Sequence, residues 1–124
     1  MMAQAEDHSK DEKAAVQAAE KWLEIVDKGA YAESWDATAD YFKGNMTKNG
    51  WDAALKGILP AMGKMNSREF VSSRYLNRMP GAPEGKYVMI QFKTSFENKA
   101  EAIETVTPQK DEKGKWRVCA YFIK

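Results

Sequence analysis

The sequence predicts an α+β domain in which three N-terminal helices precede a four-stranded antiparallel sheet. Apolar and polar residues alternate along three C-terminal segments, 87–96, 102–107 and 116–123, as they do in strands with two different faces. In the first half of the chain, apolar residues rich in Trp and Ala recur at helical spacing. A run of helices followed by a run of strands is typical of a two-layer domain with the helices on one face of the sheet.

Start and stop signals divide the helical half into three segments. The first helix follows a capping box formed by Ser9 and Glu12 and ends at Gly29. The second covers about residues 31–45, and Thr47 caps the third. The residues expected on the buried stripes are Ala15, Ala19, Trp22, Leu23, Val26, Tyr31, Trp35, Thr38, Ala39, Phe42, Trp51, Ala54, Leu55 and Ile58.

The sheet half begins with an extended segment at about residues 69–78, and a turn at 80–85 leads into the next strand. If the two C-terminal turns are tight, the apolar residues collect on one face, which packs against the helices. The residues expected on this inner face are Val88, Ile90, Phe92, Thr94, Phe96, Ile103, Thr105, Thr107, Trp116, Val118, Ala120 and Phe122.

In the same register, the opposite face of the sheet carries both charged and apolar residues. It places Lys93 opposite Glu104 as a cross-strand pair, with Tyr87, Arg117 and Cys119 on the same face. This face is too apolar to be only solvated, so it is expected to form a homodimer interface. The interface residues predicted are Met89, Gln91, Val106 and Tyr121.

Composition excludes several classes of protein. The 124 residues suffice for one domain, and a net charge of +1 provides no field to attract nucleic acid. The longest apolar runs are far shorter than the roughly 20 residues that a membrane-spanning helix requires, so no membrane insertion is expected. With only one cysteine and one histidine, Cys119 and His8, the chain offers no internal disulfide, no zinc site and no nucleophile–imidazole pair. Phosphate-binding glycine motifs are also missing, and we expect no metal and no cofactor.

Residues 1–10 are expected to form a disordered polar leader ahead of a single domain at 11–124. Within it, Ala3-Gln4-Ala5 is similar to the end of a bacterial secretory signal, although no hydrophobic signal segment is present. This pattern favours a periplasmic or secreted protein, and a cytoplasmic protein is the alternative.

Several blocks of the chain resemble a family of small bacterial proteins known as domain of unknown function 4019. They are AEKWL at 19–23, YAESWD at 31–36, PGAP at 80–83, GKYV at 85–88 and GKWRV at 114–118. The resemblance covers nearly the whole domain and implies an often exported protein of unassigned activity. Helices followed by a curved meander also resemble the NTF2-like, cystatin-like fold. That fold forms a cone whose mouth can hold a small apolar ligand, and it often dimerises through the sheet. The family supplies no catalytic residues to carry over.

The tryptophans suggest an aromatic-lined cavity for a small apolar ligand, since each large ring can form part of a pocket wall. Filling the core of a small domain is the alternative, because an open cone and a filled one share this pattern. The residues predicted to contact a ligand are Trp22, Trp35, Trp51, Tyr75, Thr105 and Trp116.

An enzyme of the isomerase or dehydratase type is the alternative to a non-catalytic binding domain. A carboxylate and a phenol facing an apolar cone can move protons near neutral pH. Asp36 and Asp40 lie one helical turn apart beside Tyr41, and Tyr75 could face the same interior. Both aspartates could equally lie on a solvated helix face. The sequence therefore favours a non-catalytic domain that binds a small ligand or a protein.

Overall fold

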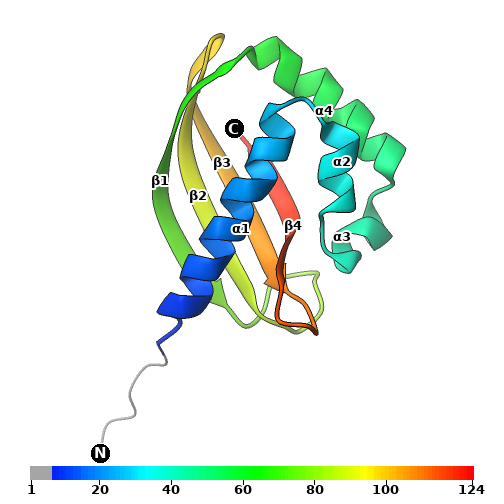
Figure 1. Cartoon of the computed structure of the whole chain (residues 1–124), viewed down its shortest axis with the longest axis vertical. Helices are drawn as coiled ribbons and strands as arrows, with labels where there is room; N and C mark the ends of the chain where they lie inside the picture. The colour runs from blue at the N-terminus through cyan, green and yellow to red at the C-terminus, as the bar shows by residue number, and fades with distance from the viewer. Residues whose placement is uncertain (1–6) are drawn as a thin grey trace, which may run out of the picture.

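The computed structural model describes residues 7–124, which fold into a curved antiparallel sheet with four helices on one of its faces (Figure 1). In chain order the elements are α1 (Ser9–Asp27), α2 (Tyr31–Asp36), α3 (Asp40–Asn45), α4 (Lys48–Met62), β1 (Met65–Leu76), β2 (Tyr87–Phe96), β3 (Lys99–Lys110) and β4 (Trp116–Ile123). Neighbouring strands are hydrogen-bonded antiparallel in the order β1-β2-β3-β4. The predicted α+β class and sheet order are thus confirmed.

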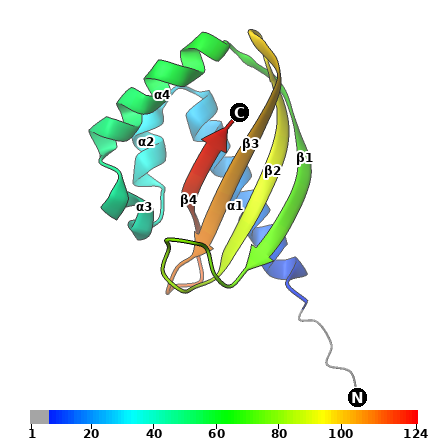
Figure 2. The same cartoon turned by 180° about the vertical axis from the view of Figure 1, so that it is seen from behind.

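The helices form one layer over the sheet. In Figure 1, α1 runs diagonally across the face of the sheet. The helices α2, α3 and α4 lie next to α1, towards the β4 edge of the sheet. Figure 2 shows the opposite face of the sheet, which none of the described helices covers. The core therefore lies between α1, α4 and the inner face of the sheet. Most of the predicted leader lies outside the described residues, including Ala3 to Ala5, but Ser9 and Lys10 already belong to α1.

The start of α1 differs from the predicted capping box. His8 is the N-cap residue and its side chain makes no capping bond, while Asp7 Oδ1 accepts a hydrogen bond of 2.9 Å from the Ser9 amide. Glu12 Oε1 instead accepts a bond of 2.8 Å from Ser73 Oγ on β1. Because the helix begins one residue earlier than the box requires, Ser9 is inside the first turn, and Glu12 is free to tie the helix to the sheet.

The buried stripe of α1 is the one that helical spacing predicts. Its members are Ala15, Ala19, Trp22, Leu23 and Val26, all at most 3% exposed. Alanines at the close approach to the sheet allow α1 to lie near the strands, while the larger side chains fill the space towards α4. Each large apolar side chain buried in this way contributes about 1.5–3 kcal/mol.

The predicted second helix is two short helices, α2 and α3, and the break lies at Thr38 and Ala39. Thr38 Oγ1 donates to the Trp35 carbonyl (2.6 Å), which ends α2. The Ala39 amide donates to the Val118 carbonyl of β4 (2.8 Å). It is therefore not available for the hydrogen bond that a continuous helix would require. A tertiary hydrogen bond to the sheet outweighs the local helical pattern here.

Both ends of α4 are fixed by local chemistry. Thr47 caps the helix as predicted, since its hydroxyl accepts a bond of 3.1 Å from the Gly50 amide. The helix ends at Gly63, whose φ of +80° is in the region that favours glycine. A Cβ atom at this position would also meet the Glu97 side chain at 2.9 Å, so the tight approach of the β2–β3 hairpin requires glycine.

The predicted register of β2 and β3 is wrong by one residue. The hairpin turns at Glu97 and Asn98, one residue earlier than the predicted turn, and a register shift follows between Thr94 and Phe96. As a result Lys93 pairs with Ile103, and Glu104 pairs with Phe92 on the inner face. Because side chains alternate with a period of two, a slip of one residue exchanges the two faces of β3.

This shift reverses the predicted faces over β3 and the end of β4. Val106 pairs with Ile90 and Tyr121 pairs with Val106, so both lie on the helix side, where they were not expected. A second shift between Thr107 and Pro108 keeps Trp116 and Val118 on the inner side, as predicted. The residues wrongly placed on the inner face are Ile103, Thr105, Thr107, Ala120 and Phe122, and those wrongly placed on the outer face are Glu104, Val106 and Tyr121.

Candidate functional site

A cavity of about 440 Å³ lies at the end of the molecule where α1 and α4 stop and β1 begins. Its apolar wall consists of Val26, Tyr31, Leu59, Pro60, Met65 and Phe96. Three charged residues also line it: Asp27, Lys64 and Glu104. The volume falls in the range of about 300–1,000 Å³ that is typical of small-molecule sites. The cavity is therefore the first candidate for a functional site.

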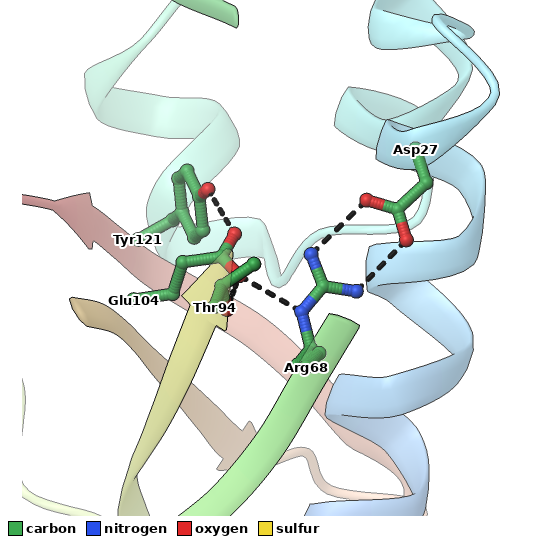
Figure 3. Close-up of polar contacts among 5 residues, drawn as sticks. All are labelled: Asp27, Arg68, Thr94, Glu104 and Tyr121. Atoms are coloured by element: carbon green, nitrogen blue, oxygen red, sulfur yellow. Dashed lines mark hydrogen bonds and ion pairs between the residues drawn. The ribbon is translucent and has the colours of Figure 1, made fainter. Parts of the chain in front are cut away.

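Behind the cavity lies a cluster of five polar residues that come from α1 and from each of the four strands (Figure 3). We call Asp27, Arg68, Thr94, Glu104 and Tyr121 the Arg68 cluster. Arg68 Nε donates to Glu104 Oε1 at 2.8 Å. The other two guanidinium nitrogens donate to Asp27, Nη1 to Oδ2 at 2.8 Å and Nη2 to Oδ1 at 3.0 Å. This bidentate pairing fixes the end of α1 against the first strand.

Glu104 is deeply buried, with its side chain 1% exposed. Besides Arg68, it accepts a bond of 2.5 Å from Thr94 Oγ1 and one of 2.5 Å from the Tyr121 hydroxyl. A buried carboxylate is tolerated only when it is paired and hydrogen-bonded, and here three donors serve it. No buried side-chain nitrogen or oxygen in residues 7–124 lacks a hydrogen-bond partner.

The environment keeps Tyr121 and Arg68 in their ordinary protonation states. Burial, the neighbouring Glu104 carboxylate and the hydrogen bond to it raise the pKa of Tyr121 well above its usual value, so the phenol remains a donor. Burial alone would lower the pKa of Arg68, but its hydrogen bonds to Asp27 and Glu104 outweigh that effect and raise it. The cluster is therefore a fixed arrangement of charges at neutral pH.

The sequence did not reveal this cluster because the predicted register turned Glu104 outwards. The turn at 97–98 together with the register shift between Thr94 and Phe96 places Arg68, Thr94 and Glu104 on the inner face. Three polar residues on an otherwise apolar face indicate a network, since each needs a partner when buried.

Of the tryptophans predicted to contact a ligand, Trp22 and Trp51 lie in the core and Trp35 packs against it. Trp22 and Trp51 are 3% and 6% exposed and meet at Ser34, where the Trp22 indole donates to the carbonyl and the Trp51 indole to the hydroxyl, each at 2.9 Å. Trp35 is half-buried and donates to the Met46 carbonyl at 2.7 Å. None of these side chains lines the cavity.

The remaining predicted ligand residues also lie elsewhere. Trp116 is half-buried under the Lys110 ammonium, 5.9 Å from the ring centre. Thr105 lies on the outer face opposite Gln91, and Tyr75 stacks on the His8 ring at 3.5 Å. Tyr31 and Phe96 are the aromatic residues that do line the cavity.

The four residues considered for proton transfer are only partly brought together. Asp36 is exposed and forms a surface ion pair with Lys48 at 3.0 Å. Asp40 and Tyr41 line a second, wide hollow of about 790 Å³, which neither Asp36 nor Tyr75 lines. The Tyr41 hydroxyl donates a hydrogen bond of 2.7 Å to the Gly81 carbonyl.

Two further findings concern the described part of the chain. Within residues 7–124, no group of three or more His, Cys, Asp or Glu side chains is arranged to hold a metal ion. In the same range no helix combines the length and the apolar character needed to cross a membrane.

Cys119 lies in a small second core with Tyr87 and Ala39, and it is 4% exposed. Burial raises the pKa of the Cys119 thiol to about 12. We therefore expect the folded protein to resist alkylation at pH 8, and one thiol per chain to react after unfolding. Because the folded-state pKa is the higher one, the thiol contributes no pH dependence below its ordinary pKa and lowers stability as pH rises above it. Mass spectrometry after timed iodoacetamide treatment measures the reactivity. Rapid labelling of the native chain would contradict the expectation.

Helices on one face of an open antiparallel sheet, with a cavity at one end beside a buried ion cluster, define a small α+β domain. The chain belongs to the family described as protein of unknown function (DUF4019), whose family model matches residues 18–121. This confirms the resemblance seen in the sequence. Neither a search of curated proteins nor a search of solved structures finds a significant match.

Proposed function

We propose that this protein is a non-catalytic domain that binds a small, largely apolar molecule in the cavity lined by α1, α4 and β1. The observation that supports this most directly is the cavity itself, with a volume of about 440 Å³ and six apolar residues in its wall. Small-molecule sites typically combine such a wall with a few fixed polar groups. An NTF2-like cone with its mouth at this end is the architecture we propose for the pocket.

The polar groups at the cavity suit binding better than catalysis. Glu104 is held in one orientation by Arg68, Thr94 and Tyr121. A side chain fixed in this way loses little entropy when a ligand arrives, which favours affinity.

Proton-transfer catalysis remains the second candidate because a carboxylate and a phenol, Glu104 and Tyr121, touch beside the cavity. Such an enzyme would exchange a carbon-bound hydrogen of its ligand with solvent. Incubation of the protein and its co-purified ligand in D₂O distinguishes the two candidates. Deuterium on a ligand carbon would favour the enzyme, and its absence is the result we expect.

The cavity is tested by native mass spectrometry of gently purified protein and of a variant in which the cavity is filled. Met65 lines the cavity at the start of β1, so Met65→Trp places an indole in the space for the ligand. We expect bound mass of defined stoichiometry on the wild-type chain and its loss in Met65→Trp. Ser67→Trp adds the same side chain at an exposed position of the same strand and should retain the ligand. A wild-type chain without bound mass would argue against the proposal.

Export to the periplasm or the cell exterior is also part of the proposal, and the protein should be purified from that compartment. Cell fractionation followed by immunoblotting tests it. Recovery of the protein with the cytoplasmic fraction alone would contradict export.

We further propose that the outer sheet face pairs two copies of the chain. Of the predicted interface residues, Met89 and Gln91 lie on this face half-buried, whereas Val106 and Tyr121 do not. Two apolar side chains on this face support the proposal: Phe122 is 66% exposed and Ile103 is 39% exposed.

Size-exclusion chromatography with light scattering measures the mass in solution. We expect a dimer for the wild-type chain and a monomer for Phe122→Glu, because a charge buried in an apolar interface without a partner loses its hydration. A wild-type monomer at high protein concentration would contradict the pairing.

A further inference from the structure

We propose that the ligand of this cavity carries a positively charged nitrogen, an ammonium or quaternary ammonium group, which points towards Asp27 and Glu104. This inference rests on the proposed function and specifies the class of ligand. It follows from three properties of the cavity: which ionic groups face it, what hydrogen-bonding capacity they have left, and which rings stand beside them.

The first property is the sign of the charge that the cavity presents at depth. Asp27 and Glu104 line the cavity, whereas Arg68, which joins them, does not. The carboxylates are 23% and 1% exposed. Arg68 pairs with both carboxylates at 2.8 Å, so the three groups together carry one formal negative charge, and the carboxylates are the members that line the cavity.

Lys64 is the cation that lines the cavity, and it lies at the rim. Its residue is exposed at the junction of α4 and β1, and its backbone amide donates to Glu97 Oε1 at 2.8 Å. A long, solvated ammonium can turn away into water. The two carboxylates are less exposed than Lys64, so they are the charges that face the interior.

The second property is an excess of hydrogen-bond acceptors. Two carboxylates offer about eight acceptor positions. Glu104 uses three of them, for Arg68, Thr94 and Tyr121, and Asp27 uses two for Arg68. Both hydroxyls of the cluster already donate to Glu104. The two carboxylates can therefore accept further hydrogen bonds from a ligand, and the Tyr31 hydroxyl and the Lys64 ammonium at the rim are the side-chain donors of the lining. This balance suits an ammonium better than a carboxylate or phosphate.

The third property is an aromatic wall. Tyr31 and Phe96 line the same space as the two carboxylates. Burial, followed by the nearby charges of Asp27 and Asp52, raises the pKa of Tyr31, so its ring remains neutral. A cation near the face of an aromatic ring is stabilised electrostatically by the ring quadrupole. Anionic groups and aromatic rings together favour an organic cation with an apolar body over a hydrated metal ion.

The test uses three probes of matched size that differ in charge: n-hexylammonium, 1-hexanol and hexanoate. Each is titrated at pH 7 into the full chain and followed by amide chemical shifts, which also locate the site. We expect n-hexylammonium to bind at the cavity about tenfold more tightly than 1-hexanol, and hexanoate to bind most weakly. Equal binding of the ammonium and the alcohol, or preference for hexanoate, would overturn this inference and leave the proposed function standing. If none of the three binds, both fail.

Three variants identify the group that recognises the charge. Asp27→Asn should reduce the affinity for n-hexylammonium about tenfold and change that for 1-hexanol little. Glu24→Gln removes one negative charge from an exposed position on the same helix and should have no effect. Lys64→Met should strengthen ammonium binding, since it removes the cation at the rim. If Asp27→Asn folds normally and still prefers the ammonium, or if Lys64→Met weakens ammonium binding, the assigned charge recognition is wrong.

Discussion

Replacing Arg68 by Met is expected to destabilise the protein by about 3–5 kcal/mol. Arg68 is the cation that pairs with Glu104 and Asp27, and Glu104 is 1% exposed. Without the guanidinium, a buried carboxylate keeps two hydroxyl donors but loses its countercharge. Since small domains are stable by only about 5–15 kcal/mol, the loss should be plain in urea denaturation at pH 7.

Two further variants show whether charge is the cause. Adding Glu104→Gln to Arg68→Met removes the uncompensated charge while keeping an amide that can bond to Thr94 and Tyr121, so much of the stability should return. Arg78→Met is the matched control, because Arg78 pairs with Glu84 in a fully solvated contact of 3.8 Å. Its effect should be within about 0.5 kcal/mol. If Arg68→Met costs no more than Arg78→Met, the cluster does not stabilise the fold as described.

Replacing Trp22 by Ala is expected to cost about 3–5 kcal/mol, through lost contacts and an internal void. Trp22 is 3% exposed, and its ring centre lies 5.4 Å from that of Tyr121 and 6.2 Å from that of Trp51. Its indole also donates to the Ser34 carbonyl. Thermal and urea unfolding of the variant should both show the loss.

Trp22→Phe separates packing from hydrogen bonding. It keeps a ring but leaves the Ser34 carbonyl without the indole donor, so we expect a smaller loss of about 1–3 kcal/mol. Val71→Ala serves as the control, since Val71 is 53% exposed and its truncation should change stability by less than about 0.5 kcal/mol. A Trp22→Ala variant as stable as Val71→Ala would mean that the tryptophan is not a core residue.

The buried stripe of α1 and the start of α4 could be predicted because their signals are local, whereas Ala54 and Ile58, also expected on a buried stripe, are exposed in α4. The spacing of Ala15, Ala19, Trp22 and Val26 identified the buried stripe of α1, and Thr47 marked the start of α4. The break between α2 and α3 could not be predicted in this way. It depends on a hydrogen bond from Ala39 to Val118, a residue 79 positions later in the chain.

The candidate site could not be predicted, because it depends on the register of one hairpin. Along β3, the set Ile103, Thr105 and Thr107 is as apolar as the set Ala102, Glu104 and Val106 that faces the helices. Period-2 alternation therefore does not indicate which set is buried. The register shift between Thr94 and Phe96 exchanges the two sets, because moving a tight turn by one residue alone keeps the same residues on each face. Without this shift, the predicted register placed Glu104, Val106 and Tyr121 on the wrong face.

The sequence alone determined the class of fold, the order of its strands and the core of its first helix, since hydrophobic periodicity and turn residues act over a few residues. It also excluded the chemistry of zinc and of nucleophile–imidazole pairs, because the chain has one histidine and one cysteine. Only the tertiary structure decided where the cavity lies and what faces it. Asp27, Arg68, Thr94, Glu104 and Tyr121 come from five different elements. They meet because burying Glu104 requires partners that no nearby stretch of the chain could supply.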